Sequence, residues 1–180
     1  DGLAKKLRLQ EVAHENRLPL VSLSQSGGAN LQYAHEVFIP GGRGFANQAR
    51  LSALGIRQVT VVHGSATAGG AYQPGLSDYV IMVRGQATMY LAGPPLLKAA
   101  TGEVATDEEL GGAEMHAQVS GVGDYLAEDD ADGIRLAREV IGALPWPKDS
   151  AGGGFAPPLF PASELAGLVP SDPKWPYDCR

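Results

Sequence analysis

The chain has 180 residues, of which 44% are apolar and 19% charged, and its formal net charge is −6. This length and composition indicate one globular domain rather than a disordered segment, and an acidic chain without a Lys/Arg cluster is not a nucleic-acid binder. No apolar run approaches the roughly 20 residues that cross a bilayer, so we expect no membrane segment. One cysteine, Cys179, can build neither a disulfide framework nor a metal site, which favours a cytoplasmic location.

Strand-like and helical patterns alternate along residues 1–144, which predicts an α/β fold with a largely buried sheet. An amphipathic helix begins the chain and is followed by a strand over 17–23, a helix over 45–56 and a strand over 58–65. A short helix over 68–76, broken at Pro74, leads to two strands, DYVIMVRG and ATMYLAG. Next come a helix over 94–103, a capped turn beginning at Thr106 with Glu109 in capping-box spacing, and a helix from Asp129 to Pro145.

After residue 144 the sequence becomes rich in proline and glycine and loses its periodicity. We therefore expect residues 1–144 to form the domain and residues 145–180 to be a linker or an extended arm. The chain begins abruptly in helical pattern and stops without a closing element, so we expect it to be part of a longer protein.

Two glycine pairs are the most distinctive local feature. The first glycine run, SQSGGANL (24–31), and the second, HGSATAGGAYQPGL (63–76), each follow a strand and lead into a helix. Such a pair can simply permit positive φ and close backbone approach. It also leaves the first N–H groups of a helix unpaired, so two such ends facing one another would form an oxyanion hole from backbone alone. We expect the two strands to be neighbours in one sheet, with both runs at the same end.

The residues that nucleotide binding, metal binding or nucleophilic catalysis would need are not found in the expected patterns. Neither run has the Lys-Ser/Thr of a phosphate loop, GGRG (41–44) follows Pro40 rather than a strand, and the four histidines have no metal-ligand spacing. Ser26 and Ser65 would be nucleophiles only with a neighbouring base, which the sequence does not indicate. The acidic runs DEEL and EDDAD are typical of helix caps and solvated faces.

Several separate motifs resemble one family in the right order: SGGANL, GSATAGGAYQPGLSDYVIMV, LAGPPLLKAATGE and DEELGGAEMHAQVSGVGDYLAEDD. Over residues 5–144 they are similar to the N-terminal half of the carboxyltransferase (β) subunit of biotin-dependent acyl-CoA carboxylases. The resemblance implies an α/β, crotonase-like (ClpP/crotonase) spiral of β-β-α units. It also implies an incomplete domain, truncated at its start, with 145–180 leading toward a missing C-terminal half.

The resemblance also implies a function for the glycines. The family's oxyanion glycines correspond to Gly27 and Gly28, and by wider crotonase analogy Ala29, Gly69 and Gly70 could add amides; which pair acts stays open. The amides would stabilise the enolate of a coenzyme A thioester. Biotin, carried as carboxybiotin on a partner subunit, would supply CO2 and then act as the base, and no metal is implied in this chain.

The implied partners are an acyl-CoA, a biotin carboxylase/biotin carrier (α) subunit and further copies of the chain, as a hexamer in the full-length form, with no nucleic acid and no membrane. The family's active site lies between the N-terminal half of one subunit and the C-terminal half of another, so we expect this chain alone to be inactive.

FANQARLSALGI and GPPLLKAATGE look most like the methylcrotonyl-CoA type. Gln25, where that branch has an acidic residue, and Gln32, Tyr33 and His35 after the glycines leave the acyl group open. Two alternatives remain: a biotin-dependent acyl-CoA decarboxylase subunit of the same fold, and a non-catalytic scaffold that binds CoA esters.

Overall fold

The computed structural model describes residues 2–145, 159–161, 163, 164, 170 and 172. The chain divides into two units, 1–144 and 145–180, and the helices and strands named below belong to the first. Most of 145–180 lies outside the described residues, so its role as a linker stays a prediction.

A five-stranded sheet forms the centre of the first unit. Its strands are β1 (Leu20–Ser26), β2 (Gln58–Thr67), β3 (Tyr79–Val83), β4 (Thr88–Tyr90) and β5 (Tyr125–Ala127). The spatial order is β1-β2-β3-β5, β4 pairs with the end of β2, and all of these pairings are parallel. The sheet confirms the expected α/β architecture, but β1 begins and ends three residues later than the predicted strand. Its polar end, Ser24–Ser26, belongs to the strand because backbone pairing with β2 continues there.

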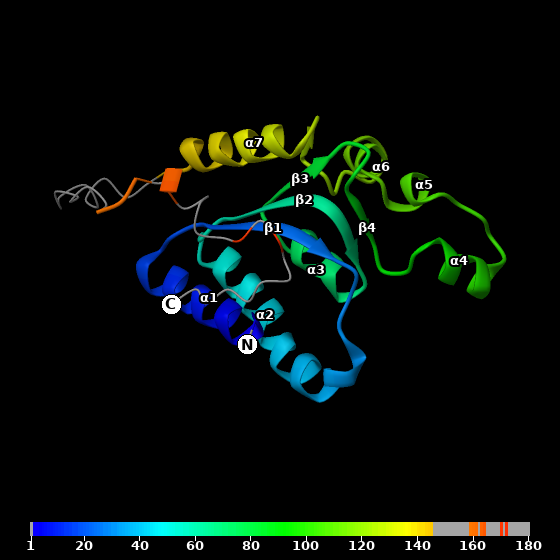
Figure 1. Cartoon of the computed structure of the whole chain (residues 1–180), viewed down its shortest axis with the longest axis horizontal. Coiled ribbons are helices and arrows are strands. Elements are labelled where there is room, and N and C mark those ends of the chain that lie inside the picture. The colour runs from blue at the N-terminus through cyan, green and yellow to red at the C-terminus, as the bar shows by residue number, and fades with distance from the viewer. Residues whose placement is uncertain (1, 146–158, 162, 165–169, 171, 173–180) are drawn as a thin grey trace. The chain divides into compact units, whose positions relative to one another are not determined.

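Helices cover both faces of the sheet (Figure 1). Helices α1 (Gly2–Asn16), α2 (Ala34–Ala53) and α3 (Gly69–Gly75) lie on one side, and α7 (Asp130–Ala143) lies on the other. Three short helices, α4 (Pro94–Thr101), α5 (Asp107–Gly111) and α6 (Ala113–Met115), follow β4, and α4 stands away from the sheet. A 3₁₀ turn (Leu31–Tyr33), a π-helical turn (His116–Ser120), α6 and β5 were not expected from the sequence.

Helix α2 begins 11 residues before the predicted helix and includes Pro40 and three glycines. Glycine and proline are the weakest helix formers, so local propensity alone would not predict a helix there. Helix α1 packs against this stretch: the Gln10 side chain donates to the Gly44 carbonyl at 2.9 Å, and Lys6 Cε lies 3.7 Å from where a Gly44 Cβ would be. Tertiary contact therefore stabilises a helix that the sequence disfavours. Likewise, Pro74 does not break α3 but lies inside it.

The sheet separates two apolar clusters. On the α7 side, Val59, Val61, Ile81 and Val83 pack with Ala137 and Val140. Gly133 lets α7 approach closely, since a Cβ there would lie only 3.0 Å from Val61. The other cluster contains Val62, Val80, Met82, Ala71, Met89 and Ala113. Alternation along each strand thus buries both faces of the sheet.

Buried glutamines tie the helices to the sheet. The amide of Gln58, at the start of β2, donates to the Gln48 carbonyl of α2 at 2.8 Å, and the Gln48 amide donates to the Gln73 carbonyl of α3 at 3.0 Å. Because these side chains are almost fully buried, losing such a bond would leave a polar group without water. The contacts therefore fix how α2 and α3 lie on β2.

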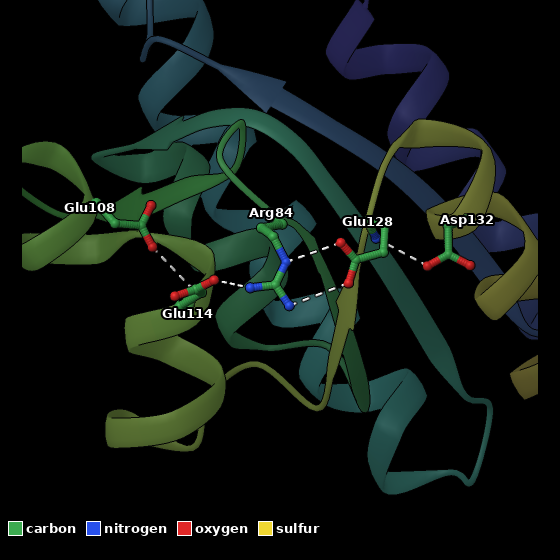
Figure 2. Close-up of polar contacts among 5 residues, drawn as sticks. All are labelled: Arg84, Glu108, Glu114, Glu128 and Asp132. Atoms are coloured by element: carbon green, nitrogen blue, oxygen red, sulfur yellow. Dashed lines mark hydrogen bonds and ion pairs between the residues drawn. The ribbon is translucent and has the colours of Figure 1, made fainter.

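Arg84 joins the segments that follow β3. Its guanidinium pairs with Glu128, with N···O distances of 3.2 and 3.3 Å, and also with Glu114, whose own N–H donates to Glu108 (Figure 2). The Glu128 N–H in turn donates to Asp132 near the start of α7 at 3.0 Å. The Glu128 hydrogen bond, with Arg135, lowers the pKa of Asp132 below its usual value. One cation thus links α6 to the end of β5, although these exposed pairs contribute little free energy each.

Asp78 offers a test of the contacts that start β2. It accepts the Gln58 N–H at 2.8 Å, the Ser52 hydroxyl and the Arg57 guanidinium at 3.3 Å, and its side chain is only 10% exposed. Asp78→Ala should lower the free energy of unfolding by about 1–3 kcal/mol, because these donors lose a partly buried acceptor. Urea unfolding measures the change. In the control, Glu11→Ala removes an exposed ion pair and should change the free energy of unfolding by under about 1 kcal/mol. If both variants lost the same stability, Asp78 would not be an important acceptor for the start of β2.

Candidate active site

The two glycine runs lie at the same edge of the sheet, as the sequence predicts. Strands β1 and β2 are parallel neighbours whose register runs from Leu20 opposite Gln58 to Ser26 opposite Ala66. The register shifts between Ser24 and Ser26, so β2 has extra residues at 63–65. Because both strands point the same way, each ends at the same edge and continues directly into its glycine run.

The runs are in contact through Ser26. A Cβ built on Gly70 would lie 2.9 Å from Ser26 Cβ and 3.0 Å from Ser26 Oγ, so Ser26 or the backbone would have to shift to make room for it. Ser26 Oγ also accepts the N–H of Gly28 at 3.2 Å, within the turn that Gly28 makes with φ = 109°. The structure therefore brings Gly28 and Gly70 to the same serine.

A strained residue precedes the second glycine pair. Ala68 has φ = 54° and ψ = −123°, a conformation that residues with a Cβ rarely adopt, and α3 begins at the next residue. The Ala68 N–H donates to the Tyr90 carbonyl of β4 at 3.1 Å. The Tyr90 hydroxyl donates to Asp107 at 2.6 Å, and this hydrogen bond, with burial, raises the pKa of Tyr90. Strand β4 thus holds the backbone in place where α3 starts.

All five candidate residues are accessible. Gly27, Gly28, Ala29 and Gly69 are exposed, and Gly70 is partly exposed. Gly69 and Gly70 are the first residues of α3, where N–H groups have no acceptor within the helix. Neighbouring positions expose large apolar side chains, namely Leu31, Tyr33 and Tyr72. This edge therefore offers backbone donors beside apolar surface.

Carboxylate, imidazole and ammonium side chains are almost absent from the two glycine runs. Residues 24–31 and 64–76 include no Asp, Glu, His, Lys or Arg. His63, at the start of the second run, lies 3.9 Å from Asp130, while His116 bonds to Ser120 and to the Met89 carbonyl. Within the described ranges, neither the Ser26 nor the Ser65 hydroxyl pairs with a histidine or a carboxylate. The arrangement suits stabilisation of negative charge rather than nucleophilic catalysis.

Sequence patterns did not single out Lys6, which the fold brings to α3. Its ammonium donates to Gln73 at 3.0 Å and lies 5.5 Å from the centre of the Phe45 ring, which in turn contacts Tyr72. Burial lowers the pKa of Lys6 from its usual value. The helical pattern of α1 could indicate only which face Lys6 occupies.

A cavity of about 460 Å³ lies away from the glycine runs. Residues of α1 and of the second half of α2 line it, among them Gln10, His14, Asn47 and Leu51. The cavity lies at one end of α2 and the first glycine run lies at the other, so the cavity is separate from the candidate site.

Across the residues that the structure places, no three His, Cys, Asp or Glu side chains gather closely enough to hold a metal ion. No helix of the described chain is both long enough and apolar enough to cross a membrane.

Gly70 and Gly69 form a matched pair for testing the contact between the runs. Gly70→Ala should lower the free energy of unfolding, because its Cβ would meet Ser26 at 2.9 Å and one strand end must shift. Gly69→Ala meets nothing within 4 Å and should be neutral or slightly stabilising. Chemical unfolding compares the two; a Gly70→Ala protein as stable as Gly69→Ala would mean that the runs do not touch.

Comparison with known proteins places these features in a family. Residues 2–180 match the family described as the carboxyl transferase domain. The probable biotin-dependent acyl-coenzyme A carboxylase beta2 subunit of Mycobacterium tuberculosis is 51% identical over 179 residues, 99% of this chain and 34% of that protein. The mitochondrial methylcrotonoyl-CoA carboxylase beta chain of Dictyostelium discoideum is 50% identical over 181 residues, 98% of this chain and 31% of that protein.

A solved structure shows the same fold. The beta subunit of geranyl-CoA carboxylase from P. aeruginosa superimposes with a TM-score of 0.76 at 66% identity, covering 98% of this chain and 33% of that one. This chain thus spans about a third of the length of these relatives. The likeness confirms the expected α/β, crotonase-like fold. The chain belongs to the carboxyltransferase family of biotin-dependent acyl-CoA carboxylase β subunits.

Proposed function

We propose that the protein transfers a carboxyl group from carboxybiotin to an acyl-CoA, and that this chain belongs to the half that binds the acyl-CoA. The contact between two accessible glycine runs, bridged by Ser26, is the observation that supports this most directly. Membership of the carboxyltransferase family supports the reaction class.

The proposed role of the runs is to stabilise an enolate. Removing a proton beside a thioester carbonyl leaves negative charge on the carbonyl oxygen. Backbone N–H groups from 27–29 and from 69–70 would donate to that oxygen. Because folding already holds these donors in place, they need little reorganisation as the charge develops. In the free protein the Gly28 N–H is engaged by Ser26, which favours Gly27, Ala29, Gly69 and Gly70 as the readily available donors.

The chemistry of the runs fits a reaction whose base comes from elsewhere. They have no Asp, Glu, His, Lys or Arg between 24 and 31 or between 64 and 76, so the α-proton needs an outside acceptor. Biotin on a partner subunit, when bound, would supply CO2 and take up that proton. This chain would hold the thioester and lower the free energy of its enolate. The new bond then forms between the α-carbon and CO2.

We further propose an apolar acyl group, because Leu31, Tyr33 and Tyr72 expose apolar surface close in sequence to the runs. The proposed partners are a biotin-carrying α subunit and further copies of the chain as a hexamer. The expected cytoplasmic location stays a prediction.

The function is tested with the full-length subunit assembled with its biotin-carrying partner. With ATP and labelled bicarbonate, acid-stable label should enter an apolar acyl-CoA; methylcrotonyl-CoA and geranyl-CoA are suitable first substrates. Omitting the partner is the control and should abolish incorporation, as should replacing the full-length subunit by residues 1–180 alone.

Either of two results would contradict this proposal and indicate a different function. ATP-independent release of CO2 from a carboxylated acyl-CoA, without the forward reaction, would indicate a decarboxylase. Tight acyl-CoA binding without turnover in either direction would indicate a scaffold.

A further inference from the structure

Ser26 is the last residue of β1 and, within the first glycine run, the residue that packs against Gly70 of the second run. Its hydroxyl accepts the Gly28 N–H at 3.2 Å, and its Cβ and Oγ occupy the space that a Cβ on Gly70 would need. From the sequence, Ser26 could be considered only as a possible nucleophile. Its described contacts include no base that would activate it.

The Ser26 hydroxyl has hydrogen-bonding capacity to spare. A hydroxyl has one proton to donate and two lone pairs that accept. The bond from Gly28 uses one lone pair, and the described residues provide no acceptor for the proton. Ser26 is also partly exposed rather than buried in the core. A hydroxyl donor for which the described residues provide no acceptor therefore lies beside both Gly28 and Gly70.

We infer that Ser26 is an additional oxyanion donor, whose hydroxyl hydrogen-bonds to the thioester oxygen as that oxygen becomes an enolate. This inference rests on the proposed function and assigns a side chain to a site otherwise made of backbone. The hydroxyl keeps its proton throughout, and no covalent bond to Ser26 forms. The bond from Gly28 strengthens the donor, because an N–H directed at Oγ polarises the O–H group.

A purely local role is the competing explanation. Serine side chains often accept the N–H two residues ahead and so stabilise a turn. The two roles differ in what they affect: a turn residue supports the conformation of the whole run and every ligand bound there. A donor to the thioester oxygen acts only on ligands that have this oxygen and mainly when it is charged.

The experiment compares Ser26→Ala and Ser24→Ala in the full-length enzyme with its biotin-carrying partner. Ser26→Ala removes the hydroxyl but keeps the Cβ that packs on Gly70, and the Gly28 N–H it frees is exposed to water. Ser24 is the matched control, a buried serine two residues earlier in β1 and opposite Val62. For Ser26→Ala we expect kcat to fall by about 10²-fold, the typical effect of losing one oxyanion donor. Ser24→Ala should keep kcat within about threefold.

A second measurement separates the donor role from the turn role. The affinity for a thioether analogue of the acyl-CoA, which lacks the carbonyl oxygen, should be unchanged in Ser26→Ala, as should the urea unfolding midpoint. If kcat stays within about threefold of wild type, or if thioether affinity and stability fall together with kcat, the inference is overturned. A wild-type enzyme that carboxylates no acyl-CoA would instead overturn the proposed function.

Discussion

The close approach of Ser26 to Gly70 is the constraint on which the rest of the candidate site depends. Parallel pairing of β1 with β2 brings two strand ends to one edge, but only a residue without a Cβ can lie against Ser26 there. This contact sets the separation between the two sets of amides. The packing of the Ser26 side chain on the glycine backbone at Gly70 therefore shapes a site whose proposed donors are mostly backbone N–H groups.

The backbone at this edge is strained at Ala68, and a neighbouring strand holds it in place. Ala68 has φ = 54°, whereas the φ of 109° at Gly28 is one that glycine adopts readily. Tyr90 accepts the Ala68 N–H and is itself anchored to Asp107 at the start of α5. Donors fixed by such contacts lose little entropy when a ligand binds, which is the physical advantage of an amide over a flexible side chain in stabilising an oxyanion. The Ser26 hydroxyl shares this advantage because the Gly28 N–H restrains it.

Local patterns predicted the elements whose own residues determine them. Alternating apolar residues predicted the central strands, and the capping box of Thr106 and Glu109 forms with both of its hydrogen bonds. Helix α2 is the opposite case, because its residues 40–44 include Pro40 and three glycines and are stabilised by contact with α1. The end of β1 was missed for a related reason: Ser24–Ser26 are polar, and a backbone ladder does not depend on side-chain hydropathy.

The α/β class and the placing of two glycine pairs after strands follow from residue identity and spacing along the chain, and the family follows from the resemblance of whole motifs. The tertiary structure was needed to show that Ser26 packs against Gly70 of the other run, that Tyr90 restrains Ala68, and that Lys6 reaches Gln73 of α3. Each of these contacts joins residues separated by two or more secondary-structure elements, or depends on the register of β1 against β2. No local pattern encodes such distances, since strand register and helix packing are set by how the whole core closes.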